Sequence, residues 1–127
     1  MFKYNIIVYY MQKFKNLSLN QRQTESTNIM KKYPEKIPIL VYKTEKSSQP
    51  IPDLDKNKFL VTRDLTIGQF LYIIRKRLKL ESTKALFIFT EKGIIPVTHD
   101  PISVVYENHK NEDGFLYFQY SSENTFG

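Results

Sequence analysis

One stretch, Asp64–Leu80 (DLTIGQFLYIIRKRLKL), carries the most definite structural pattern in this chain. Thr66 can cap the N-terminus of a helix, and Gln69, three residues further on, completes a capping box. Basic residues crowd the last turns, where cations complement the helix dipole. We therefore expect an amphipathic helix with one buried stripe. The stripe consists of Ile67, Phe70, Leu71, Ile74 and Leu78.

Two segments before this helix are rich in β-branched and aromatic residues, which is typical of strands. They are KIPILVYK (Lys36–Lys43) and KFLVT (Lys58–Thr62). The connection Thr44–Asp55 contains two prolines and is expected to be a loop. The two strands are therefore expected to form a hairpin with a long connection.

The segments after the helix complete the pattern. ALFIF (Ala85–Phe89) is expected to be a buried strand, and FLYFQY (Phe115–Tyr120) a final strand. Between them, Asp100-Pro101 can open a short helix, with Pro101 at its first position. The order strand, strand, helix, strand, short helix, strand predicts an α+β protein of the β-grasp type. Its four-stranded mixed sheet would carry a packed helix, with two further helices at the N-terminus.

The length of 127 residues suits a single domain. Ser18 and Gln21 form a second possible capping box, in an N-terminal segment of polar residues with scattered apolar ones. We expect four parts along the chain. They are an N-terminal extension that need not be ordered (1–10), a helical segment (11–35), the core (36–120) and a flexible tail (121–127).

The composition excludes several kinds of chemistry. Without cysteine, the chain cannot form disulfides, thiolate nucleophiles or cysteine-based zinc sites. His99 and His109 have no metal-ligand companions at a motif spacing, and the glycines form no phosphate loop. We therefore expect no catalytic residue, no metal site and no enzyme. The net charge of +6 favours acidic partners, which leaves nucleic acid, anionic lipid and acidic peptides open.

The segment Lys58–Thr62 has the alternation of an edge strand. Lys56 and Lys58 would share a face with Leu60, while Phe59 and Val61 face the other way. Such an edge can accept an extended peptide by main-chain pairing, and its lysines would suit an acidic, aromatic peptide. The same lysines would equally protect the edge from aggregation.

Several motifs, in the same order, resemble those of the autophagy-related protein 8 family of ubiquitin-like modifiers, which includes the light chain 3 and GABA-receptor-associated types. They are DLTIGQFLYIIRKRLKL, KALFIF, YENHKNEDGFLY and SSENTFG. The resemblance runs from about Met11 to Gly127 and is densest from Lys36 onward. It implies a ubiquitin-like β-grasp core with two extra N-terminal helices.

The resemblance also implies a chemical role for the terminal glycine. In the family, activating and conjugating enzymes pass the glycine carboxylate along as thioesters and join it to the amine of phosphatidylethanolamine. Gly127 would be that residue, and covalent phosphatidylethanolamine the expected attached group, with no cofactor. A cysteine protease would remove the lipid again. The implied locations are the cytoplasm and the membranes of autophagosomes or related vesicles.

The resemblance implies docking sites for receptors that carry a short aromatic-x-x-aliphatic motif. The aromatic pocket would be formed by Glu25, Ile29, Pro38, Lys58, Leu60 and Phe115. The aliphatic pocket would be formed by Phe59, Val61, Leu65, Phe70 and Ile73. Acidic residues of the motif would contact Lys56, Lys58 and Arg77, and a second docking surface would fall on Phe87, Ile88 and Phe89.

Two other functions remain open at this point. The same fold could serve without lipidation, as an adaptor on vesicles, the cytoskeleton or another organelle. A basic nucleic-acid-binding domain is the third hypothesis, although most aromatic residues fall in strands, where core packing explains them. We therefore expect no nucleic acid as partner.

Overall fold

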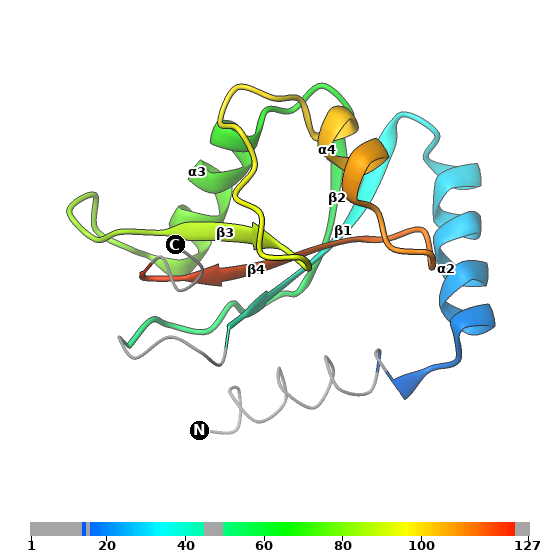
Figure 1. The fold of residues 1–127 in the computed structure, drawn as a ribbon, viewed down its shortest axis with the longest axis horizontal. Coiled ribbons are helices and arrows are strands. Elements are labelled where there is room, and N and C mark those ends of the chain that lie inside the picture. Colours follow the sequence, from blue (N-terminus) through cyan, green and yellow to red (C-terminus); the bar gives the residue numbers. More distant parts are fainter. Residues whose placement is uncertain (1–13, 15, 45–49, 124–127) are drawn as a thin grey trace.

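The computed structural model describes residues 14, 16–44 and 50–123. Within them the chain forms three helices and four strands in the expected order (Figure 1). The elements are α2 (Leu19–Lys32), β1 (Lys36–Lys43), β2 (Lys58–Thr62), α3 (Ile67–Leu78), β3 (Phe87–Thr90), α4 (Ile102–His109) and β4 (Leu116–Ser121). The first of the two expected N-terminal helices falls largely outside the described residues.

The four strands form one mixed sheet in the order β2-β1-β4-β3. β1 pairs antiparallel with β2 and parallel with β4, and β3 pairs antiparallel with β4. A parallel pair needs a long crossover connection, and α3 and α4 lie in the chain that runs from β2 to β4. In Figure 1, α3 and α4 lie on one side of the sheet, and α2 stands beside it. The predicted β-grasp fold is confirmed.

The helix boundaries follow from local hydrogen bonds. Both predicted capping boxes are present, at Ser18 with Gln21 and at Thr66 with Gln69. α3 ends at Lys79, which adopts a left-handed conformation with φ of 58°. Pro101 is the N-cap of α4 rather than its first helical residue, so that prediction was wrong by one position. β3 and β4 each begin later than expected, by two residues and by one.

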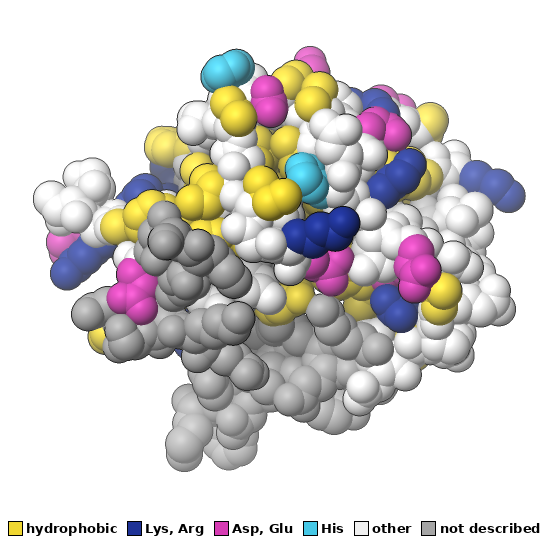
Figure 2. Space-filling view, viewed as in Figure 1, with side chains coloured by type: hydrophobic (Ala, Val, Ile, Leu, Met, Phe, Trp, Pro, Cys, Tyr) yellow, Lys and Arg dark blue, Asp and Glu magenta, His cyan; other side chains and the backbone are white. Residues whose placement is uncertain are grey.

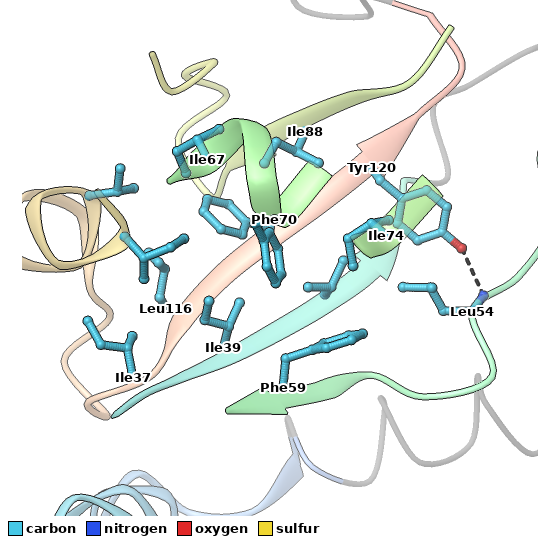
Figure 3. Close-up of a cluster of buried hydrophobic side chains, with 14 of the residues drawn as sticks. Ile37, Ile39, Leu54, Phe59, Ile67, Phe70, Ile74, Ile88, Leu116 and Tyr120 are labelled. Carbon is cyan, nitrogen blue, oxygen red and sulfur yellow. Dashed lines mark hydrogen bonds between the residues drawn. The ribbon is translucent and has the colours of Figure 1, made fainter. Parts of the chain in front are cut away.

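The main core lies between the sheet and α3. Alternate residues of β1 point into it, while the residues between them face the other side of the sheet. Phe70 of α3 lies at the centre, with its ring centroid 5.7 Å from that of Phe59 and 5.8 Å from that of Phe118. Figure 3 shows Phe59 and Phe70 in this packing. It also shows the Tyr120 hydroxyl, which accepts a hydrogen bond from the backbone N–H of Leu54. The predicted stripe of α3 is buried here except for Leu71, which is half-buried.

A second, smaller cluster covers the opposite face of the sheet. It contains the buried side chains of Phe14, Leu40, Phe115 and Tyr117. Ile29 of α2 packs against it. The sheet is therefore covered on both faces, and the second cluster joins it to the N-terminal part of the chain.

Candidate functional site: an open strand edge between two apolar clusters

β2 is an edge strand within the described part of the chain, because its one neighbour in the sheet is β1. The side chains of Lys58, Phe59 and Leu60 alternate as expected. The prediction that Lys56 shares the face of Lys58 was wrong, because Lys56 precedes the strand and its Nζ lies 5.5 Å from the centroid of the Phe59 ring. Phe59 joins the main core, while Lys58 and Leu60 lie opposite Leu40 and Pro38 on the other face. A strand in this position presents backbone N–H and C=O groups along its outer side, to which an extended peptide can bind.

The residues predicted for the aromatic pocket come from four parts of the fold, and β2 itself carries Lys58 and Leu60. Glu25 and Ile29 lie on α2, Pro38 on β1, and Phe115 directly before β4. Pro38 and Leu60 are register partners, and Lys58 Nζ lies 2.6 Å from Glu25 Oε1. We call this group, with Lys58 and Leu60, the aromatic-pocket residues. The structure brings them together, and their role in binding stays a prediction.

A residue that the sequence did not single out lies among them. Phe14 is 8% exposed, and its ring meets that of Phe115 edge to face, with 5.2 Å between centroids. Lys58 Nζ lies 4.5 Å from the centroid of the Phe14 ring. In the sequence Phe14 is one scattered apolar residue in a polar segment, and no local pattern indicates its position.

The residues predicted for the aliphatic pocket lie on the other side of β2. Phe70 is fully buried and Phe59 nearly so, so they form its base rather than its rim. Val61, Leu65 and Ile73 are half-buried. The set therefore belongs partly to the core, and it reaches the surface through these last three side chains.

The three predicted cationic residues are spread along the edge. Lys56 Nζ and the Arg77 guanidinium lie 5.5 and 5.8 Å from the Phe59 ring centroid. Arg77 also forms an ion pair with Asp55, at 3.4 Å. Together with Lys58 they give the edge a positive charge, which suits an acidic peptide.

The position of α2 depends on a buried carboxylate. Asp113 Oδ2 accepts a hydrogen bond from Arg22 Nη1 at 2.8 Å and another from the Tyr117 hydroxyl. Asp113 Oδ1 accepts from the Phe115 backbone N–H at 2.8 Å. Ser26 donates to the Asp113 carbonyl oxygen at 2.6 Å. We call Arg22, Ser26, Asp113 and Tyr117 the α2 anchor.

Gly114 allows the close approach of α2. Its φ is +91°, a left-handed conformation that favours glycine, and an added Cβ would lie 2.3 Å from Ser26 Oγ. The anchor therefore fixes the helix that carries Glu25 and Ile29 against the start of β4.

We expect the α2 anchor to make the protein sensitive to alkaline pH. Burial, and then the hydrogen bond with Asp113, raise the pKa of Tyr117 above its ordinary value of about 10. The raised folded pKa adds stability that is complete below about pH 10 and is lost as pH rises toward the folded value. The free energy of unfolding in urea, measured between pH 8 and 11, should therefore fall as pH increases.

A pair of variants isolates this effect. Tyr117→Phe should lower stability at neutral pH and make the alkaline decline shallower. Burial also raises the pKa values of Tyr106 and Tyr120, so these two tyrosines should maintain the rest of the decline. Tyr72→Phe, at a tyrosine that is 59% exposed, should leave the decline as it is. Equal slopes for the two variants would contradict the assignment to Tyr117.

The second predicted docking surface is only partly at the surface. Ile88 is 1% exposed and lies in the main core, and Phe89 is fully buried. Phe87 is half-buried, and its ring stacks near that of Phe89. Because side chains alternate along β3, Ile88 faces the main core and Phe89 faces the opposite way. Phe89 is nevertheless fully buried, so neither side chain lines a surface in this conformation. Of the three residues, Phe87 alone remains a predicted part of the second docking surface.

Other expected features can be placed only in part. Gly127 lies outside the described residues. No helix in residues 16–44 and 50–123 is long and apolar enough to cross a bilayer. The same residues contain no group of three or more His, Asp or Glu side chains placed to hold a metal ion. On the face drawn in Figure 2, Lys and Arg are interspersed with Asp and Glu.

A mixed four-stranded sheet with a helix packed on one face and an open edge strand defines a ubiquitin-like protein. Residues 21–127 match the family model described as "Autophagy protein Atg8 ubiquitin like". The chain belongs to the Atg8 family of ubiquitin-like autophagy proteins, and the family prediction is confirmed.

Individual relatives support the same family. Autophagy-related protein 8d of Arabidopsis thaliana is 54% identical over 109 residues, which cover 86% of this chain and 88% of that protein. Autophagy-related protein 8 of Schizosaccharomyces pombe is 53% identical over 112 residues, covering 88% and 90%. The crystal structure of Trypanosoma brucei ATG8 superposes with a TM-score of 0.77 at 38% identity, covering 89% of this chain and 95% of that one.

Proposed function

We propose that this protein is conjugated through Gly127 to phosphatidylethanolamine and recruits receptors with short aromatic-x-x-aliphatic motifs to autophagosomal membranes. The observation that carries the proposal is the family match, which extends through Gly127. Glycine suits the chemistry because it places no Cβ beside the reacting carbonyl and lets the backbone enter a narrow enzyme cleft. The protein is then a substrate of activating and conjugating enzymes rather than an enzyme itself.

The strand edge supports the receptor half of the proposal. Among the described residues, β2 has one sheet neighbour, so its outer backbone groups face away from the sheet. Apolar side chains lie on both of its faces, and Lys56, Lys58 and Arg77 lie along it. A peptide added to β2 would place alternate side chains toward the two predicted pockets. Acidic residues beside the motif would meet the three cations. The other proposed partners are a delipidating cysteine protease and the receptors. The protein would meet them in the cytoplasm and at vesicle membranes.

The intact mass of the protein from membrane and soluble fractions of starved cells tests the conjugation. We expect a phosphatidylethanolamine adduct on Gly127, confined to membranes and located by fragmentation. Gly127→Ala should abolish the adduct, while Thr125→Ala, a matched change two residues earlier, should keep it. An unmodified mass in both fractions would refute conjugation and favour the non-lipidated adaptor.

A further inference from the structure

Phe14 lies among the residues that are predicted to form the aromatic pocket. Its ring is almost fully buried, edge-on to Phe115, and the Lys58 ammonium lies over it at 4.5 Å. Both contacts are to aromatic-pocket residues. The Phe14 backbone is helical, and its carbonyl oxygen accepts a hydrogen bond from the Leu17 N–H at 3.1 Å.

The same lysine also has a carboxylate partner from this chain. Lys58 Nζ donates to Glu25 Oε1 at 2.6 Å. Lys58 therefore meets one aromatic ring and one carboxylate, both intramolecular. These are the two chemical groups that an acidic, aromatic peptide would offer to it.

We propose that Phe14 occupies the aromatic pocket of the free chain, so that a docking peptide binds by displacing it. This inference rests on the proposed docking function and adds its regulation. The apparent affinity for a peptide is then the intrinsic affinity reduced by the fraction of molecules in which Phe14 has left. Any event that draws the N-terminal segment away would raise the affinity at this edge without altering the pocket.

The contacts that hold Phe14 are of a strength that a ligand can overcome. An edge-to-face aromatic pair and a cation over a ring are each modest interactions. The Glu25–Lys58 pair is partly exposed, with side chains 34% and 49% accessible, and such pairs contribute little. A peptide that supplies a ring, a carboxylate and main-chain hydrogen bonds offers replacements for all of them, so Phe14 tunes affinity rather than abolishing it.

The test is the dissociation constant of a labelled peptide with an acidic residue before a Trp-x-x-Leu motif, measured by fluorescence anisotropy. Phe14→Ala should bind about two- to tenfold more tightly than the unaltered protein, the range that one aromatic pair is worth. Leu17→Ala is the matched control. It shortens a side chain that packs on the same cluster and keeps the backbone N–H that donates to Phe14. It should bind like the unaltered protein.

Equal or weaker binding by Phe14→Ala would overturn the inference, because the ring would then be a wall of the pocket and not its occupant. A second measurement uses the unaltered protein and therefore does not require Phe14→Ala to fold. The nuclear Overhauser effect between the Phe14 and Phe115 rings should be present in the free protein and lost at saturating peptide. If it persists while peptide is bound, this inference alone fails. If no variant binds peptide, the docking function fails and this inference with it.

Discussion

Asp113→Ala is expected to lower the free energy of unfolding by about 3–5 kcal/mol, the usual cost of removing one partner of a buried ion pair. The side chain is fully buried and accepts hydrogen bonds from Arg22, Tyr117 and the Phe115 backbone. Alanine would leave all three donors without their acceptor. The Arg22 side chain keeps 19% exposure, so water can partly replace the carboxylate, which favours the lower part of this range.

Urea unfolding at neutral pH measures this loss, with Glu112→Ala as the matched control. Glu112 is the neighbouring exposed acidic residue, and its change should stay within about 0.5 kcal/mol. Asp113→Ala should also weaken peptide docking, because Glu25 and Ile29 lie on the helix that Asp113 holds. A stability loss as small as that of the control would show that the α2 anchor contributes little.

Most of the fold could be predicted because its signals are local. The capping boxes at Ser18 and Thr66 involve residues three positions apart, and both form. The strands Lys36–Lys43 and Lys58–Thr62 have the predicted bounds, because turn-forming residues border runs of β-branched and aromatic ones. The alternation of Lys58, Phe59 and Leu60 also follows from strand geometry alone.

What the sequence did not reveal depends on pairs that are distant along the chain. Arg22 and Asp113 are 91 positions apart, and NEDG (Asn111–Gly114) indicates only a turn. The close approach of Ser26 to Gly114 spans nearly the same distance. Phe14 was missed for a similar reason, because nothing in its own segment indicates that it meets Phe115 and Lys58.

The docking residues show how far a resemblance extends beyond such local signals. It placed Glu25, Pro38 and Leu60 in one group although they come from three different elements, and the fold does bring them to one edge. It also placed Ile88 and Phe89 on a surface, and there burial in this chain disagrees. Matching positions to a family therefore indicates which residues are neighbours in the fold. The exposure of each side chain depends instead on what this chain packs over it.

Phe70→Ala is expected to lower both the stability of the core and the affinity of the aliphatic pocket for a peptide. The ring is fully buried, between Phe59 and Phe118, and its truncation should cost about 3–5 kcal/mol through lost burial and a residual cavity. Phe59 forms the base of the predicted aliphatic pocket, so the cavity would open beneath the position where the aliphatic residue of a peptide binds.

The size of this loss decides how it should be measured. A domain of this kind has about 5–15 kcal/mol of stability, so Phe70→Ala could leave too little folded protein for a binding assay. Urea unfolding of Phe70→Ala should give the stability loss, and Phe70→Leu, which keeps most of the volume, should serve for peptide binding. Tyr72→Ala is the control, because Tyr72 lies on the same helix but is 59% exposed, and it should alter neither quantity appreciably.

If Phe70→Leu binds peptide as tightly as the unaltered protein while Phe70→Ala loses stability, Phe70 belongs to the core alone. The aliphatic pocket then ends at Val61, Leu65 and Ile73. Weaker binding by a folded Phe70→Leu protein would instead show that the pocket depends on the ring beneath it.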